Sequence, residues 1–359
     1  MPVKRNDTAK RMSPPKIPTS IPVVDLSGTE QASAAARRRA ASEIHRACRE
    51  TGFFYVSNHG VAQRLIDDEF AQVRRLFDLP LEEKMSMWMK RSPSAAGYEP
   101  IGEQILDSQD LSQQAAPPDL KESFYVGEEV PDDHPYVVAG YRGYGKNEWP
   151  KNLPGFREQM LGYGSAMRLL GNRILELIAI SLDLPDRWFA PFYERAGAKL
   201  RMIKYPPQPD NAAFNQLGAG AHTDWGGITI LAQDDIGGLQ VRNVAGEWIE
   251  ARPLPGTFVV NLGDLMARWT NGIYNSTLHR VRNNASGRDR YSVPCFYSPD
   301  PRAVIEPIPT CIDDEHPRMF ATCTAEEHTA EMFRRSYGYL PKSRDKPPEP
   351  SSGLDARSS

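Results

Sequence analysis

Two histidines and one aspartate of this chain have the residue types and the spacing of a metal site. His222 and Asp224 lie two residues apart in AHTDWGGITIL, and His279 follows in NSTLHRV. Two imidazoles and one carboxylate on one face of a six-coordinate metal ion leave three positions open, which is the ligand set of non-haem Fe(II) sites that react with O2. The three residues therefore predict an iron centre with room for further ligands.

A cation and a hydroxyl group follow soon after His279. Arg290 and Ser292 lie two residues apart in RYSVPCFY, a segment rich in aromatic and β-branched residues that predicts a strand. Residues two apart share a face of a strand, so both side chains can hold one carboxylate. Pro294 cannot donate a ladder hydrogen bond, which predicts a sheet edge or a bulge at this position.

Strand and turn signals also surround the metal candidates. Ile228–Leu231 is a strand-forming run after a Gly-Gly pair. Alternation along a strand predicts that His222 and Asp224 project together from one strand or its end. His279 is expected on a third strand, after the turn signal Thr270-Asn271-Gly272.

A His-x-Asp pair also occurs by chance, and His279 alone would be interpreted as a structural histidine. The order of turn, His-x-Asp, strand, Gly-Gly turn, strand, His and Arg-x-Ser favours the metal site. The remaining histidines lack such surroundings and are interpreted as structural or solvent-facing: His45, His59, His134, His316 and His328.

Four further residues near the motifs need an assignment. Asp264 in NLGD is interpreted as a turn-capping carboxylate rather than a fourth ligand. Alternation directs Trp225 away from the metal candidates and into sheet packing, whereas Trp269 either lines the pocket or packs beneath it. Cys295 is expected on the strand face opposite Arg290, outside the site.

Together these motifs resemble the Fe(II)/2-oxoglutarate-dependent oxygenases of the isopenicillin-N-synthase-like family. The resemblance covers roughly residues 20–338. Its catalytic part is carried by HTDWGGITILAQDDIGGLQV, VVNLGDLMARWTNGIYNSTLHRV and RYSVPCFYSP, and its N-terminal part by IPVVDL, ETGFFYVSNHGV, RRLFDLPLEEK and LKESFYVG. The expected fold is mixed α and β, with a double-stranded β-helix (jelly roll) core flanked by helices and an N-terminal α/β region.

The resemblance also implies roles for individual residues. The three metal candidates would bind iron, and Arg290 and Ser292 would bind the distal carboxylate of 2-oxoglutarate. Tyr205 in IKYPP matches a family tyrosine that touches this cosubstrate, and Phe296 matches an aromatic position that faces the substrate. One departure is visible, because some members carry Asn two residues before the tyrosine and this chain has Ile203. That change weakens the expected cosubstrate contact.

The implied activity is that of an enzyme using Fe(II), 2-oxoglutarate and O2. It would couple oxidative decarboxylation of 2-oxoglutarate to hydroxylation, desaturation, cyclisation or rearrangement of a small molecule, in specialised-metabolite biosynthesis. Two alternatives stay open. One is an iron- and O2-dependent oxidase without 2-oxoglutarate, in which Arg290 binds the substrate's own carboxylate, and the other is a non-catalytic ligand-binding relative.

Composition agrees with a cytoplasmic enzyme of this kind. The 359 residues, 40% of them hydrophobic, can form one large domain or two closely packed units. The net charge of −3 gives no electrostatic reason to expect a nucleic-acid partner. No apolar run predicts a membrane span or a signal peptide. The four cysteines are scattered, which predicts free thiols in a reducing compartment, and no feature predicts the oligomeric state.

The chain divides into four predicted regions. Residues 1–19 and 341–359 are polar tails expected to be disordered. Residues 20–150 form the N-terminal α/β region, and residues 151–340 form a helix plus the jelly-roll catalytic domain. Periodicity predicts helices at 31–49, 62–77, 155–183 and 325–337, while residues 91–155 are expected to be loops and short strands that line the substrate mouth.

Overall fold

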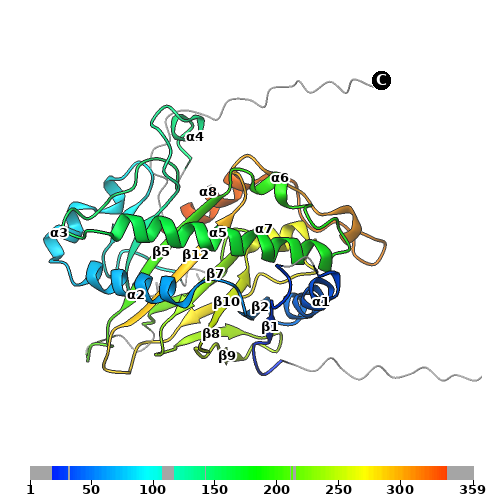
Figure 1. The fold of residues 1–359 in the computed structure, drawn as a ribbon, viewed down its shortest axis with the longest axis horizontal. Coiled ribbons are helices and arrows are strands. Elements are labelled where there is room, and N and C mark those ends of the chain that lie inside the picture. The colour runs from blue at the N-terminus through cyan, green and yellow to red at the C-terminus, as the bar shows by residue number, and fades with distance from the viewer. Residues whose placement is uncertain are drawn as a thin grey trace, which may run out of the picture.

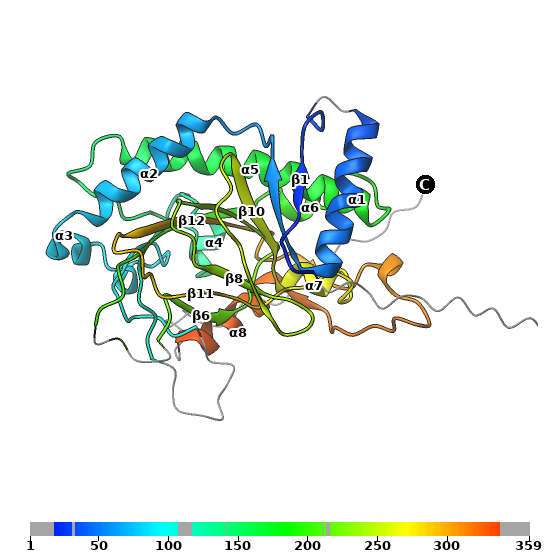
Figure 2. The same ribbon diagram turned by 90° about the horizontal axis from the view of Figure 1, so that it is seen from below.

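The computed structural model describes residues 18–30, 33–106, 117–141, 143–210, 212 and 216–337. The tails predicted to be disordered therefore lie almost entirely outside the described residues. Two β-sheets face each other, and helices pack on the outer face of the larger one (Figures 1 and 2). This arrangement confirms the predicted mixed α and β class with a jelly-roll core.

The larger sheet has eight strands in the order β1-β2-β10-β7-β12-β5-β4-β3. All neighbours pair antiparallel except β1 and β2, which are parallel. The first four strands of the chain form the two ends of the sheet, so the predicted N-terminal and catalytic regions share it. Its strands are Val23–Asp25 (β1), Phe53–Ser57 (β2), Gly97–Glu99 (β3), Glu122–Val126 (β4), Gly197–Tyr205 (β5), Ile228–Gln233 (β7), Thr257–Leu262 (β10) and Arg290–Ser298 (β12).

The smaller sheet has four strands in the order β6-β11-β8-β9 and lies against the inner face of the larger one (Figure 2). Apolar side chains of both sheets meet in one buried cluster between them, as jelly-roll packing requires. The four strands are Ala219–His222 (β6), Leu239–Arg242 (β8), Trp248–Glu250 (β9) and His279–Val281 (β11). Val304–Ile305 (β13) and Cys323–Thr324 (β14) form a separate pair.

The long helix α5 (Phe156–Ser181) crosses the outer face of the larger sheet (Figure 1). The helix lies within the predicted range 155–183, and its seven apolar residues at steps of three and four, from Phe156 to Leu177, are buried in the main core. Two amphipathic helices, α1 (Ala34–Glu50) and α2 (Gln63–Phe77), pack beside it and lie close to the predicted bounds.

The remaining helices are short apart from the last. They are α3 (Leu81–Ser86), α4 (Pro135–Val138), α6 (Ala190–Tyr193), α7 (Asp264–Trp269) and α8 (Ala325–Tyr337), with 3-10 turns η1 (Met89–Arg91) and η2 (Pro309–Cys311). After α7, Asn271 and Gly272 adopt positive φ angles of 51° and 81°. This turn leads to β11, as the sequence predicted.

The prediction of a sheet edge or bulge at Pro294 was wrong. β12 is a central strand, and its pairing with β7 runs without a shift in register from Ser292 to Tyr297. On the other side, the pairing with β5 is interrupted at Val293 and Pro294 and resumes at Cys295 in the same register. The missing proline N–H is accommodated by a local gap on one side of the strand.

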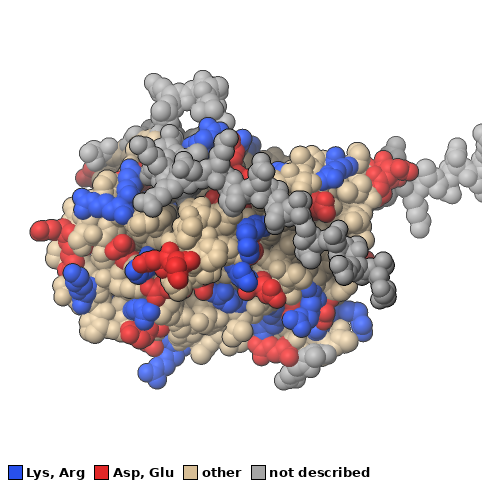
Figure 3. All heavy atoms as spheres, turned by 90° about the horizontal axis from the view of Figure 1, so that it is seen from above, with Lys and Arg blue, Asp and Glu red and all other residues tan. Residues whose placement is uncertain are grey.

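No described helix is both long enough and apolar enough to cross a membrane. On the face shown in Figure 3, basic and acidic side chains are interspersed among uncharged residues.

Candidate metal and cosubstrate site

The three predicted metal ligands lie together at the smaller sheet. His222 is the last residue of β6 and His279 the first residue of β11. The two are opposite each other in the antiparallel pairing, with ring centroids 4.2 Å apart. Asp224 follows β6, and its Oδ1 lies 3.9 Å from Nε2 of His222 and 3.7 Å from Nε2 of His279. One potential ligand atom from each of the three residues lies within 4.8 Å of the other two, and no other such group of three occurs among the described residues.

Both histidines are oriented by their own strands. Nδ1 of His222 lies 2.8 Å from the carbonyl oxygen of Gly220, and Nδ1 of His279 lies 3.1 Å from that of Thr277. A carbonyl oxygen only accepts, so each Nδ1 must carry the proton and donate it. The lone pair of each ring is thereby left on Nε2, the atom that faces Asp224. This donor set fits a divalent iron ion.

The carboxylate of Asp224 is held by two side chains of the larger sheet. Its Oδ2 accepts hydrogen bonds from Thr229 Oγ1 at 2.5 Å and from Asn261 Nδ2 at 2.7 Å. Thr229 on β7 and Asn261 on β10 are direct cross-strand partners. The contacts leave Oδ1 directed at the histidines. Neither Thr229 nor Asn261 was predicted from the sequence as a site residue, although both lie in motifs quoted above.

Burial and neighbouring groups shift the pKa values of His222 and Asp224. Burial, together with a smaller contribution from the neighbouring His279, lowers the pKa of His222 to about 3, so His222 is neutral at pH 7. Burial alone would raise the pKa of Asp224. The two histidines and the hydrogen bonds from Asn261 and Thr229 outweigh this and lower it, so Asp224 is ionised. A neutral imidazole and an ionised carboxylate are the forms that bind metal.

The segment that carries Asp224 is fixed by the start of α7. Backbone N–H groups of Asp264 and Leu265 donate to the carbonyl oxygens of Asp224 (2.8 Å) and Gly226 (3.1 Å). A Cβ atom at Gly263 would lie 2.2 Å from the Gly226 carbonyl oxygen. Glycine is therefore required at position 263 for the HTDWGG and NLGD motifs to pack against each other.

Replacing Asn261 by Leu will weaken metal binding by about 10- to 100-fold while preserving the fold, because Asp224 loses one of its two orienting donors. The metal dissociation constant should be measured by competition with a chelator, alongside the melting temperature. Thr229→Ser keeps the second donor hydroxyl and should bind metal as the wild type does. Unchanged metal affinity in the Leu variant would show that Asn261 does not orient the ligand.

A small buried cavity of about 60 Å³ adjoins the triad and holds the predicted carboxylate anchor. Arg290, Ser292 and Tyr205 line it together with the three metal candidates. Arg290 is 2% exposed, its guanidinium lies 4.7 Å from the Tyr205 ring centre, and its Nη2 makes a long contact of 3.4 Å to Gln233 Oε1. Among the described residues, its Nε and Nη1 have no hydrogen-bond partner.

A desolvated cation with unpaired N–H groups is costly unless an anion completes it. The cavity therefore fits a small carboxylate that spans from the Arg290 guanidinium to the metal position. 2-Oxoglutarate has a carboxylate at each end and matches this donor arrangement.

A second cavity of about 210 Å³ extends outward from His222 and Asp224. Phe296 on β12 lines both cavities, at the junction where a substrate would meet the metal. Side chains from residues 91–155 contribute to the outer wall, including Tyr125 and Tyr144. Phe296 and part of the segment 91–155 thus line this outer cavity, and their predicted contact with the substrate stays a prediction.

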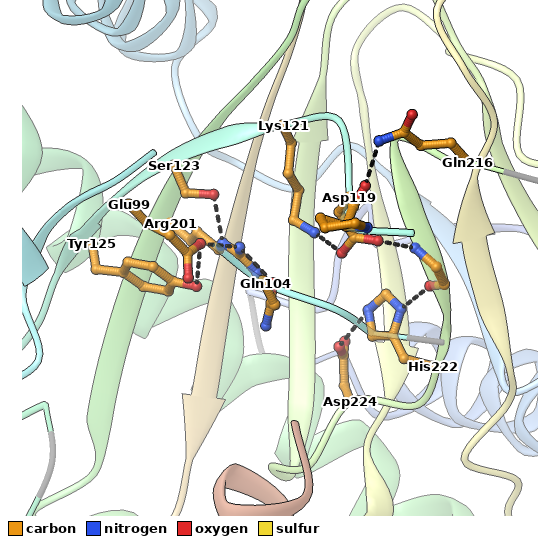
Figure 4. Close-up of polar contacts among 12 residues, drawn as sticks. Glu99, Gln104, Asp119, Lys121, Ser123, Tyr125, Arg201, Gln216, His222 and Asp224 are labelled. Atoms are coloured by element: carbon orange, nitrogen blue, oxygen red, sulfur yellow. Dashed lines mark hydrogen bonds and ion pairs between the residues drawn. The ribbon is translucent and has the colours of Figure 1, made fainter. Parts of the chain in front are cut away.

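Arg201 on β5 lines both cavities, and its polar contacts are drawn in Figure 4. Its Nη2 donates to Glu99 Oε2 at 2.7 Å and to Gln104 Oε1 at 2.8 Å, and its Nε donates to Ser123 Oγ at 3.1 Å. The guanidinium is thus held rigidly and its charge is balanced by Glu99. It presents a fixed polar surface to both the small cavity and the outer cavity.

Two predictions about tryptophans require correction. Trp225 does not pack into a sheet; it lines the outer cavity, with its ring 6.5 Å from that of Phe333 on α8. β6 ends at His222, so strand alternation does not extend to position 225. Trp269 does not line the pocket. It is 1% exposed in the main core, where Phe189 and Phe192 pack against it at 5.3 and 5.4 Å.

Asp264 lies outside the cluster of potential ligands, in the first turn of α7. Its carboxylate accepts hydrogen bonds from Ser276 Oγ at 2.6 Å and from Thr223 Oγ1 at 3.4 Å. Asp264 therefore does not join the metal candidates, as predicted, but its side chain links distant segments instead of capping a turn. Cys295 is buried in the core on the other face of β12, as expected.

Comparisons with known proteins agree with this geometry. Residues 21–152 match the family described as non-haem dioxygenase in morphine synthesis N-terminal, and residues 196–299 match the 2OG-Fe(II) oxygenase superfamily. The chain is 37% identical over 326 residues to the 2-oxoglutarate-Fe(II) type oxidoreductase hxnY of Emericella nidulans, covering 89% of this chain and 91% of that protein. It is 35% identical over 305 residues to azadirone synthase of Melia azedarach, covering 82% and 88%.

Among solved structures, a full-length Neurospora crassa protein in complex with alpha-KG and thymine is similar, with a TM-score of 0.75 and 29% identity over 88% of this chain and 96% of that one. These matches favour an enzyme that uses 2-oxoglutarate over the alternatives of an oxidase without it or a non-catalytic relative. The chain belongs to the 2OG-Fe(II) oxygenase superfamily, in its isopenicillin-N-synthase-like group, and is an Fe(II)- and 2-oxoglutarate-dependent dioxygenase.

Proposed function

We propose that His222, Asp224 and His279 hold the iron, that Arg290, Ser292 and Tyr205 hold 2-oxoglutarate, and that a small organic molecule is oxidised in the outer cavity. One observation carries the proposal: the metal triad and a buried arginine with unpaired N–H groups line the same cavity.

In this assignment the protein binds and orients the reactants. Nε2 of each histidine and Oδ1 of Asp224 would occupy one face of the ion, leaving the opposite face open. Arg290 can grip the distal carboxylate with two parallel hydrogen bonds, and Ser292 shares its strand face and can add a third. Bound iron, with 2-oxoglutarate and O2, supplies the oxidising power, and 2-oxoglutarate is converted to succinate and CO2.

The substrate position follows from the shared wall of the two cavities. Phe296 lies where they join, so a molecule in the outer cavity meets the metal between Phe296 and Trp225. The apolar part of the outer wall is aromatic, and its polar part includes Arg201 and Lys199, a combination typical of small-molecule pockets. Placement of the reacting carbon against the metal then decides between hydroxylation, desaturation, cyclisation and rearrangement.

We assign the substrate to specialised metabolism as part of the proposal. The support is that the similar proteins from Melia azedarach and Neurospora crassa are named for azadirone synthesis and bind thymine, respectively, both small organic molecules. The aromatic lining of the outer cavity suits a compact, partly apolar molecule.

The proposal is tested by incubating the iron-loaded protein with a fungal or plant metabolite extract, with and without 2-oxoglutarate, and analysing both by mass spectrometry. We expect a metabolite to be lost only when 2-oxoglutarate is present, with an equal amount of succinate formed. The Asp224→Ala protein is the control for reactions of free iron. Loss of a metabolite without succinate formation would instead favour an oxidase in which Arg290 binds the substrate's own carboxylate.

A further inference from the structure

Lys121, in the LKESFYVG motif, has no role in the site described above. Its side chain nevertheless lines the small cavity that adjoins the metal triad, together with Arg290 and Ser292. It immediately precedes β4, and its side chain is 2% exposed. The pairing of β4 with β5 joins Glu122 to Lys204, so Lys121 lies level with Tyr205. The residue therefore reaches the proposed cosubstrate cavity from the wall beside Tyr205.

The ammonium group of Lys121 is incompletely satisfied. Within the described part of the chain its hydrogen-bond acceptor is a carboxylate oxygen of Asp119 (Figure 4). An ammonium has three donors, so two remain for a ligand. Loss of water lowers the pKa of Lys121, and the negative charge of Asp119 opposes this. An anion in the cavity would provide the acceptors that the buried cation lacks.

The neighbouring position on β5 explains why a second hydrogen-bond donor is useful. Ile203, where some family members carry Asn, also lines this cavity and offers no hydrogen bond. Ile203 pairs with Ser292 on one side and with Ser123 on the other. A cosubstrate in the cavity thus finds an apolar side chain between the anchor strand and β4, and Lys121 supplies a donor from the start of β4.

Asp119 connects Lys121 to a metal ligand. Its Oδ1 accepts a hydrogen bond from the backbone N–H of Gly220 at 2.9 Å, and the Gly220 carbonyl oxygen accepts the Nδ1 proton of His222 at 2.8 Å (Figure 4). One carboxylate therefore holds both the cation and the strand segment that orients His222. The ammonium position is fixed relative to the metal position.

We propose that Lys121 is a second cationic binding residue for 2-oxoglutarate, which replaces the donor missing at Ile203, and that Asp119 positions it. The inference rests on the proposed assignment of this cavity to 2-oxoglutarate. Three cations then line the cavity of a cosubstrate that carries two carboxylates: Arg290, Lys121 and Arg201, of which Arg201 already donates to Glu99, Gln104 and Ser123. The distal carboxylate is anchored by Arg290, and Lys121 binds from the side wall.

The test measures 2-oxoglutarate binding rather than turnover. Protein loaded with redox-inert Mn(II) is titrated with 2-oxoglutarate by calorimetry, and the Mn(II) dissociation constant and melting temperature are measured in parallel. The variants are Lys121→Met, Asp119→Asn and the double variant Asp119→Asn/Lys121→Met, which leaves no unpaired buried charge. Lys84→Met is the matched control, because Lys84 is also buried and paired with a carboxylate, that of Glu122, but lies outside the cavity.

We expect the Lys121→Met and double variants to bind 2-oxoglutarate about 10-fold or more weakly, the loss of one charge-assisted hydrogen bond, with Mn(II) binding nearly unchanged. Asp119→Asn, which removes the charge that positions Lys121, should weaken binding less than Lys121→Met does, and Lys84→Met should bind 2-oxoglutarate within about 3-fold of the wild type. Wild-type affinity in Lys121→Met and in the double variant would overturn the inference, as would an equal loss in Lys84→Met, which would show that loss of any buried lysine has this effect. If the wild type itself binds no 2-oxoglutarate, the cavity assignment fails instead.

Discussion

Replacing Asp224 by alanine will abolish turnover and leave the fold intact. The carboxylate is the anionic ligand of the triad, and its loss leaves only two imidazoles to hold the ion. Loss of a residue that only orients a ligand costs about 10- to 100-fold in metal affinity or activity, so loss of the ligand itself will cost more than about 100-fold. Iron content after dialysis, the rate of succinate formation and the melting temperature are the measurements.

A matched control lies close by. Asp264→Asn removes a carboxylate from the same region but keeps an acceptor for Ser276 and lies outside the triad. It should bind iron and turn over as the wild type does. Full iron occupancy with near wild-type turnover in Asp224→Ala would refute the metal assignment, and an equal loss in Asp264→Asn would show that Asp264 takes part in the centre.

The parts of the site that follow strand periodicity could be predicted from the sequence. His279 begins a strand and Arg290 and Ser292 share one face of another, so residue spacing alone placed them correctly relative to each other. Alternation failed at Trp225 because β6 ends three residues earlier and the following segment is shaped by its hydrogen bonds to α7. Those bonds join residues about forty positions apart, which no local pattern records.

Residues that act across strands were missed for the same reason. Asn261 reaches Asp224 because β10 pairs with β7 in one particular register, and that register is set by packing of the whole sheet. Lys121 reaches the cavity from the start of β4, a strand of the N-terminal region that pairs with β5 in the larger sheet. Trp269 could be assigned to either side of the pocket wall until the aromatic cluster around it was known.

Replacing Arg290 by glutamine will raise the KM for 2-oxoglutarate by at least about 30-fold and leave iron binding nearly unchanged. Truncating one partner of a desolvated, hydrogen-bonded charge pair costs about 2–5 kcal/mol, which converts to this change in affinity. Arg290 is buried, and its Nε and Nη1 have no partner among the described residues, so the full contact with a carboxylate is available. The three iron ligands are untouched.

A control variant distinguishes loss of the Arg290 anchor from loss of any positive charge near the start of β12. Arg288 lies two residues earlier, its side chain is 65% exposed and it pairs with Asp235 at 3.1 Å, so Arg288→Gln should leave the KM within about 2-fold of wild type. Titration of both variants with 2-oxoglutarate by calorimetry distinguishes binding from turnover. An unchanged dissociation constant in Arg290→Gln would mean that the carboxylate is held elsewhere in the cavity. Lys121 and Arg201 are the other cations that line the cavity, and Arg201 already donates to Glu99, Gln104 and Ser123, so Lys121 would then be the residue to which the anchor is reassigned.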